Sequence, residues 1–268
     1  MATFKVLIFG DVVGKPGRNA LKKVLPELKT KYKPDLTMLN AENIAHGFGV
    51  TEKILQEMID SGIDFFTSGN HIFKNQKNLD KNFKEFPLIR PANYPQGTQG
   101  EGYKIIEVGV TKVAIINLIG EVFFAHEKAV TNPFTYFDKL YKEIKPEKPH
   151  IIIVDFHAEA TSEKKGFGAY LDGRASLVLG THTHIQTSDS YIMPKGTGYI
   201  TDIGMVGIKH SSLGMDFDSI IYNFVHKTKE RKSIPQHGNC IINGIFAKID
   251  TDTHLTKTLE SFAIETEI

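Results

Sequence analysis

Seven side chains that can bind a metal ion follow apolar runs in this sequence, each close to the point where a run ends. They are Asp11, Glu42, Asn43, Asn70, His157, His182 and His184. Any one of them alone is more often a hydrogen-bonded structural residue than a ligand. Their joint occurrence after five runs favours one shared site, because the strands of an open α/β sheet present their carboxyl ends to a common ligand-binding crevice.

The segment Gly-Thr-His-Thr-His, residues 180–184, is the most informative of these. In extended backbone His182 and His184 point to the same face, where they can bind adjacent ions or clamp a single ion. Carboxylate and amide oxygens add hard ligands to these imidazoles, and no thiolate joins them because Cys240 lies elsewhere. The set predicts an open catalytic centre rather than a structural zinc site. It is too large for one ion and fits two ions that share a bridging carboxylate.

The glycine-rich stretch at residues 10–18 has a competing interpretation as a phosphate-binding loop. Such a loop needs four residues between its first glycine and the Gly-Lys pair, but only three separate Gly10 from Gly14. Pro16 has no backbone N–H to give to a phosphate oxygen. The stretch therefore predicts a strand end that offers Asp11 to a metal ion.

The elements that must position these residues are short apolar runs, most of them nearly continuous, which predict strands buried on both faces of a sheet. Helical patterns lie between the early runs. Residues 17–32 place apolar side chains on one face, although Pro26 is expected to kink or divide that helix. Residues 51–62 predict a second helix, with Thr51 as its N-cap and Gly62 as its stop.

Further along the chain, residues 132–145 predict another helix, and the last part reads as an antiparallel hairpin that turns at residues 250–253. The early order of strand, helix, strand, helix and strand is typical of a parallel α/β sheet. No repeat, low-complexity tract or linker divides the chain. We therefore expect a single domain over residues 1–268.

Composition bounds the classes of partner. The chain has 268 residues, of which 41% are hydrophobic and 24% charged, and its formal net charge is +1. That balance is ordinary for a soluble globular protein and predicts neither a stable nucleic-acid complex nor attraction to a membrane. No run approaches the roughly 20 apolar residues of a membrane span. The single cysteine fits a reducing compartment, so we expect a cytoplasmic protein; formation of a homo-oligomer is left open.

The strand-end blocks resemble those of the calcineurin-like metallophosphoesterase superfamily. Its members carry D-x-H, G-D-x-x-D, G-N-H-[DE], a lone His and G-H-x-H, and the corresponding segments here read GDVVG, NAENI, GNHIF, DFHAE and GTHTH in the same order. The first two blocks, with Val13 in place of a histidine, and the segment TDIGM at residues 201–205 are similar to the YmdB-like 2′,3′-cyclic-nucleotide 2′-phosphodiesterases. The resemblance spans nearly the whole chain. It implies an α/β metallophosphoesterase-type sandwich of mixed β-sheets flanked by helices, in α-β-β-α layers.

The resemblance also implies how the ligands are divided. One ion would be held by Asp11, Glu42, Asn43 and His184, and the other by Asn70, His157 and His182, with Glu42 bridging. Asn43 would supply the donor that Val13 cannot. An oxygen in place of an imidazole makes this shell harder, which favours iron or manganese over zinc.

His71 is the implied general acid. In relatives an acidic residue follows this histidine and orients it, whereas Ile72 stands here, so the orienting partner is not identified from the sequence. The implied reaction is hydrolysis of small phosphodiesters, above all cyclic nucleotides: 2′,3′-cyclic opened to the 3′-phosphate, or 3′,5′-cyclic. Two ions about 3.5–4 Å apart would share the attacking hydroxide, and His71 would protonate the departing ribose oxygen.

Two other functions stay open: a phosphomonoesterase or protein phosphatase on the same fold, and a non-catalytic nucleotide- or RNA-associated regulator. Arg174 is a candidate substrate contact, although a surface salt bridge is more usual for a lone arginine. Phe134 is a candidate base contact, although such a ring is more often buried. Lys164 and Lys165 are expected on a solvated surface.

Overall fold

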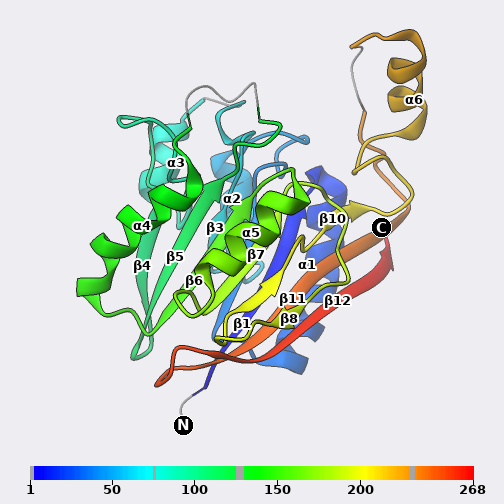
Figure 1. Ribbon diagram of the computed structural model, residues 1–268. Helices are drawn as coiled ribbons and strands as arrows, with labels where there is room; N and C mark the ends of the chain where they lie inside the picture. The colour runs from blue at the N-terminus through cyan, green and yellow to red at the C-terminus, as the bar shows by residue number, and fades with distance from the viewer. Residues whose placement is uncertain (1–2, 75–76, 125–129, 230–232) are drawn as a thin grey trace.

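Two six-stranded β-sheets lie at the centre of the molecule (Figure 1). The computed structural model describes residues 3–74, 77–124, 130–229 and 233–268. In spatial order the first sheet contains β12 (Thr256–Glu267), β11 (Asn239–Asp250), β10 (Met205–Ile208), β1 (Thr3–Val12), β2 (Leu36–Asn40) and β3 (Phe65–Thr67). The second contains β4 (Tyr103–Val108), β5 (Thr111–Ile119), β6 (Ile151–His157), β7 (Leu177–Thr181), β9 (Gly198–Ile200) and β8 (Tyr191–Ile192).

Helices cover the outer face of each sheet. The helices of the first sheet are α1 (Gly14–Tyr32), α2 (Glu52–Asp60) and α3 (Leu79–Glu85), and those of the second are α4 (Pro133–Ile144) and α5 (Thr161–Leu171). One apolar cluster fills the space between the sheets, and one lies between each sheet and its helices. The predicted α-β-β-α layers are thereby confirmed.

The continuous apolar runs are explained by this layering, because a central strand is covered on both faces. In β1, Val6 and Ile8 face the second sheet, while Leu7 and Phe9 face the helices. The strand β1 pairs in parallel with β2, and β2 pairs in parallel with β3. In the second sheet β5, β6 and β7 are also parallel. The carboxyl ends of these strands therefore lie together at the edge of each sheet.

The helix boundaries follow the predicted signals with one exception. The Oγ1 of Thr51 accepts a hydrogen bond from the backbone N–H of Ile54, and Gly62 adopts a φ of 102° just after the helix ends. Of the two expectations for Pro26, a kink or a divided helix, the division is wrong, because α1 continues through this residue. Pro26 is exposed, so water can satisfy the carbonyl of Lys22 that loses its partner.

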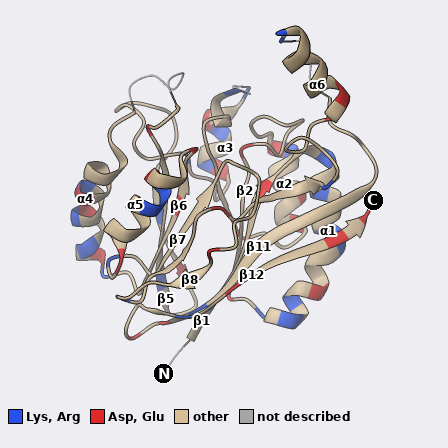
Figure 2. Cartoon of the chain, turned by 45° about the vertical axis from the view of Figure 1, so that its right-hand side comes forward, with Lys and Arg blue, Asp and Glu red and all other residues tan. Residues whose placement is uncertain are grey.

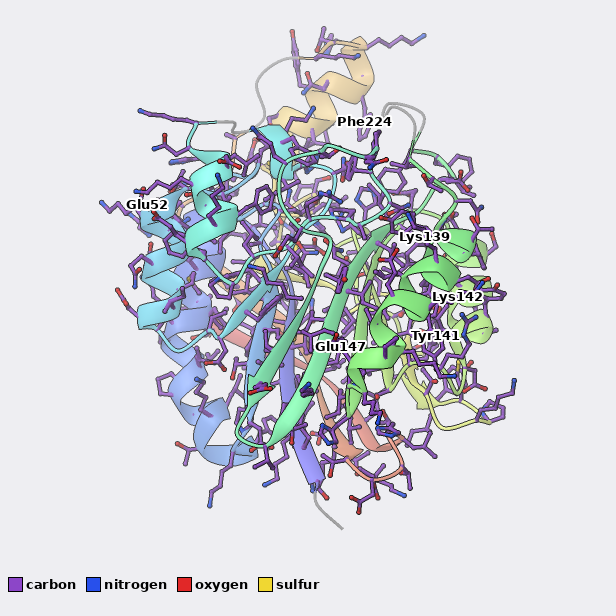
Figure 3. The ribbon with its side chains drawn as sticks, turned by 90° about the vertical axis from the view of Figure 1, so that its left-hand side faces the viewer. Glu52, Lys139, Tyr141, Lys142, Glu147 and Phe224 are labelled. Atoms are coloured by element: carbon purple, nitrogen blue, oxygen red, sulfur yellow. The ribbon has the colours of Figure 1, made fainter. Side chains whose placement is uncertain are left out.

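The helix α6 (Phe217–His226) projects from the layers at the end of an excursion between β10 and β11 (Figure 1). Phe224 on this helix is 79% exposed (Figure 3). Acidic and basic residues are distributed over the surface helices (Figure 2), in keeping with a net charge of +1. Within the described residues, no helix combines the length and the apolar character needed to cross a membrane.

Candidate metal centre and active site

The seven predicted ligands meet at the carboxyl ends of the strands of both sheets. All of the carboxylate and amide ligands come from the first sheet or its loops, and all of the imidazoles come from the second. The members are Asp11, Glu42, Asn43 and Asn70 from the first sheet and His157, His182 and His184 from the second. The stacking of the sheets therefore brings the two kinds of ligand together.

One group of ligand atoms surrounds the Nε2 atom of His157. Glu42 Oε2 lies 3.0 Å from it, His182 Nδ1 3.0 Å and Asn70 Oδ1 3.1 Å. Ligand atoms that share an ion at about 2.1 Å, at right angles, lie about 3 Å apart. The three distances to His157 Nε2 therefore fit atoms that bind one ion together, and the ligand atoms of Glu42, His157 and His182 all lie within 4.8 Å of one another.

A second group contains Asp11, Glu42 and His184. The Oδ1 atom of Asn43 lies 3.2 Å from the Nε2 atom of His184 and so joins this group. Glu42 belongs to both groups, which is the arrangement that a bridging carboxylate requires.

Two further observations fit bound cations. Asp11 is completely buried, and its Oδ1 atom has no hydrogen-bond partner among the described residues, which is costly unless an ion occupies that side. A Cβ atom on Gly69 would lie 2.2 Å from Glu42 Oε2 and 2.3 Å from His157 Nε2. Only glycine lets the backbone approach these ligand atoms so closely, and the residues present therefore fit a metal centre.

The imidazoles are oriented by partners behind them. The Nδ1 atom of His157 lies 2.9 Å from Thr181 Oγ1, and that hydroxyl donates to the buried carboxylate of Asp155. The Nε2 atom of His182 lies 2.9 Å from Glu159, and Nδ1 of His184 lies 3.0 Å from the carbonyl of residue 213. Each ring thus keeps one nitrogen toward the protein and turns the other toward the ligand cluster.

The charges of the metal-free centre are strongly coupled. Burial raises the pKa of Asp11 well above its ordinary value. Burial acts in the same direction on Glu42, but His157 and His71 outweigh it and hold the pKa of Glu42 well below its usual range. Burial would lower the pKa of His157, but Glu42, Asp11 and Asp155 raise it to about 9. Burial, with the charge of His157, lowers the pKa of His182 to about 2.

Metal binding should therefore release a proton. At pH 7 the metal-free protein holds a proton on His157, because the pKa of this group is about 9, and an ion must displace it. We expect at least one proton to be released per protein and the affinity for Mn²⁺ to rise between pH 6 and pH 8. Titration calorimetry in two buffers of different ionisation enthalpy measures this release. Equal heats in both buffers would contradict the assignment.

The loop that carries His182 and His184 is anchored by a buried ion pair. The ammonium group of Lys164 lies 2.6 Å from Asp202 Oδ2 and donates to the carbonyl of Thr181 at 2.8 Å. The same carboxylate accepts from the backbone N–H and the hydroxyl of Thr183. The expectation that Lys164 lies on a solvated surface is wrong, since its side chain is 1% exposed. Its partner lies 38 residues away along the chain, so no local pattern signals the pair.

Replacing Lys164 with methionine should lower the free energy of unfolding by about 3–5 kcal/mol, because it leaves the charge of Asp202 buried without its cation. Chemical denaturation of the metal-free protein measures this. Lys165→Met is the matched control: Lys165 pairs with Asp189 at the surface, and its loss should cost less than about 1 kcal/mol. Equal effects of the two substitutions would refute the structural role of Lys164.

His71 has partners that the sequence did not reveal. Its Nδ1 atom lies 3.1 Å from Asn43 Nδ2 and 3.4 Å from Glu42 Oε1, and its side chain is 24% exposed. The neutral ring can accept at Nδ1 from the amide of Asn43, and the protonated ring can face Glu42. In both states the Nε2 atom keeps a hydrogen for another group. Ile72 is fully buried in the core and takes no part.

The structure does not bring Arg174 and Phe134 into this cluster. Arg174 precedes β7, at the opposite end of that strand from the histidines, and pairs with Asp138 at 2.5 Å. The ring of Phe134 packs edge-on against Phe167 and Tyr170 beside the second sheet. The salt bridge accounts for the position of Arg174, and packing against the two rings accounts for that of Phe134.

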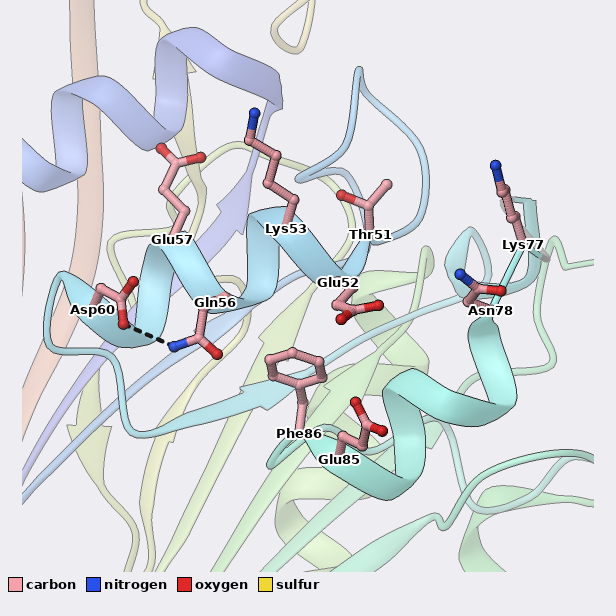
Figure 4. A pocket seen from close by; sticks show the side chains of 10 residues that line it. All are labelled: Thr51, Glu52, Lys53, Gln56, Glu57, Asp60, Lys77, Asn78, Glu85 and Phe86. Atoms are coloured by element: carbon pink, nitrogen blue, oxygen red, sulfur yellow. Dashed lines mark hydrogen bonds between the residues drawn. The ribbon is translucent and has the colours of Figure 1, made fainter.

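A groove lies between α2 and α3 (Figure 4). None of the predicted ligands lines it. Its lining residues are Thr51, Glu52, Lys53, Gln56, Glu57, Asp60, Lys77, Asn78, Glu85 and Phe86. The site chemistry therefore belongs to the strand ends and not to this groove.

Stacked mixed sheets with a candidate metal centre at their strand ends define the metallophosphoesterase type of hydrolase. The family model described as "YmdB-like protein" matches residues 7–262, and the chain belongs to this family. It is 45% identical over 260 residues to the "2′,3′-cyclic-nucleotide 2′-phosphodiesterase" of Bacillus subtilis (strain 168), covering 97% of each chain. It is thus an enzyme of the class that hydrolyses phosphoric esters.

Solved structures agree. The crystal structure of a phosphatase from Mycoplasma pneumoniae is 34% identical with a TM-score of 0.94, covering 100% of this chain and 95% of that one. A protein from Thermus thermophilus is also 34% identical, with a TM-score of 0.90, covering 98% of this chain and 99% of that one. The fold predicted from the resemblance is confirmed.

Proposed function

We propose that this protein hydrolyses nucleoside 2′,3′-cyclic phosphates to nucleoside 3′-phosphates with two divalent ions, iron or manganese. The observation that carries the proposal is the pair of ligand groups that share Glu42. The activity for which the Bacillus subtilis relative is named supports the substrate class. The oxygen-rich set around Asp11 supports a hard metal.

The residues that would hold the ions are those predicted from the sequence. Asp11, Glu42, Asn43 and His184 would hold one, and Glu42, Asn70, His157 and His182 the other. When bound, such ions lower the pKa of water and neutralise charge that develops on phosphoryl oxygens. The protein would contribute a largely buried set of ligands, whose imidazoles are already oriented by the partners behind them.

His71 would supply the proton for the leaving group. A water molecule gives its hydroxyl to phosphorus, the bond between phosphorus and the ribose 2′ oxygen breaks, and that oxygen takes a proton from Nε2 of His71. The water's remaining proton passes to solvent, and solvent returns a proton to Nε2 of His71. Asn43 and Glu42 hold the opposite ring nitrogen, so Nε2 faces away from them.

A substrate screen tests the proposal. Purified protein is loaded with Mn²⁺ or Fe²⁺ and given 2′,3′-cyclic nucleotides, 3′,5′-cyclic nucleotides and nucleoside monophosphates, and the product isomers are resolved by chromatography. Formation of 3′-phosphate from the 2′,3′-cyclic substrates supports the proposal. Faster release of phosphate from the monoesters would favour the phosphomonoesterase alternative, and no turnover with bound metal would favour the regulator.

A further inference from the structure

A partly exposed phenyl ring stands beside His71. Phe48 is 42% exposed, and its ring meets the imidazole of His71 edge-on, with 4.9 Å between ring centroids and an interplanar angle of 89°. It lies between Gly47 and Gly49, in the loop that follows β2. The ring therefore forms part of the wall next to the candidate acid.

The loop holds this ring in a defined place. The carbonyl of Gly47 accepts from the amide of Asn43 at 2.9 Å, and the backbone N–H of Phe48 donates to the carbonyl of Ala45 at 3.0 Å. Both flanking glycines have positive φ values, 91° and 68°, which a side chain would strain. The chain thus exposes a large apolar ring on a preorganised loop joined to a metal-ligand candidate.

The position of this ring matches the chemistry of one ring opening. In a nucleoside 2′,3′-cyclic phosphate the base is attached to C1′, next to C2′, so it lies closer along the ribose to the 2′ oxygen than to the 3′ oxygen. If the departing 2′ oxygen faces His71, the base reaches the neighbouring wall. If the 3′ oxygen faced His71, the base would be carried further away.

We propose that Phe48 stacks on the nucleobase of the substrate and thereby places the 2′ oxygen, rather than the 3′ oxygen, opposite His71. This inference rests on the proposed function. An aromatic side chain suits every base because each base presents a π-face, so Phe48 would recognise a base without selecting which one. It makes Phe48 a specificity-determining residue for the nucleoside and for the isomer formed.

The chain provides a matched control in Phe123. This ring is 80% exposed in the loop after β5. The ring of the adjacent Phe124 packs against His182, with 4.8 Å between ring centroids. Phe123 thus lies in a loop of the second sheet. Phe48 lies beside His71, and both follow strands of the first sheet. Phe123→Leu removes an exposed phenyl ring next to Phe124, the ring that contacts His182, and leaves Phe48 in place.

The test compares the Mn²⁺-loaded wild type with Phe48→Leu, Phe48→Tyr and Phe123→Leu. The substrates are adenosine 2′,3′-cyclic phosphate and the abasic methyl riboside 2′,3′-cyclic phosphate. We expect Phe48→Leu to lower kcat/KM for the nucleotide by about 10- to 100-fold, to leave the abasic substrate unchanged and to raise the share of 2′-phosphate product. Phe48→Tyr, which keeps a ring, and Phe123→Leu should behave as the wild type. Metal content and the midpoint of thermal unfolding verify that each variant is folded.

The outcomes separate this inference from the proposed function. If the wild type cleaves neither substrate, the proposed function fails. If it cleaves both with equal efficiency, the function stands and base stacking is overturned. Equal losses on both substrates in Phe48→Leu would show that the ring only supports His71, and an unchanged product isomer would remove its role in directing the opening. If Phe123→Leu lowers kcat/KM for the nucleotide but not for the abasic substrate, the base stacks on Phe123 instead of Phe48.

Discussion

Replacing Glu42 with glutamine should strongly slow phosphodiester hydrolysis and reduce the metal content of the protein. Glu42 is 1% exposed and belongs to both ligand groups, so its carboxylate would contact both ions. Glutamine keeps the volume but removes the negative charge, and its NH₂ group cannot act as a ligand. Because bound ions contribute several kcal/mol to the transition state, we expect kcat/KM to fall by at least about 10³-fold.

Metal analysis after dialysis, beside steady-state kinetics with excess Mn²⁺, measures both effects. Glu57→Gln is the control, since Glu57 pairs with Arg18 and Lys22 on the surface of α2 and lies outside the cluster. It should keep the metal content and turnover of the wild type. A Glu42→Gln protein that keeps two ions and full activity would rule out the bridging role.

His71→Ala should keep the metals and lose the acid. Neither of the two ligand groups contains His71, so both ions should stay bound. Loss of a general acid slows turnover by about 10²- to 10⁴-fold when the leaving group is a poor one such as a ribose oxygen. A good leaving group needs no proton, so p-nitrophenyl diesters should be cleaved at close to the wild-type rate.

The comparison of leaving groups is therefore the measurement, with metal content determined on the same samples. A plot of log kcat against the pKa of the leaving group should be steeper for His71→Ala than for the wild type. Parallel plots would show that another group gives the proton. Loss of metal in the variant would instead assign His71 to the ligand shell.

Much of the fold was predictable because a strand that is buried on both faces has a nearly continuous apolar sequence. The run from Val6 to Phe9 is apolar throughout, since alternate side chains enter the two clusters on either side of the first sheet. Helix caps such as Thr51 are equally local. Because the strands of an α/β sheet present their carboxyl ends to one crevice, the order of strands and polar residues predicted that the candidate ligands lie together.

The remaining features depend on contacts between distant segments. Lys164 has an ordinary surface sequence around it, and only the folded chain places it against Asp202. The partners of His71 are likewise distant in sequence: they are Asn43 and Glu42, in the loop that follows a neighbouring strand. Phe48 could have been suspected from its two flanking glycines, but the sequence does not show that its ring remains exposed beside an imidazole.

The division of ligands between the sheets has a consequence for the lifetime of the protein. An ion held by oxygens of the first sheet and imidazoles of the second would cross-link the two halves of the molecule. By mass action, free metal at 100 times Kd adds about 2.7 kcal/mol to the free energy of unfolding. Metal starvation would remove this cross-link. A larger fraction of the protein would then be unfolded and open to proteolysis. The supply of metal would then set how much of the protein survives as well as how fast it works.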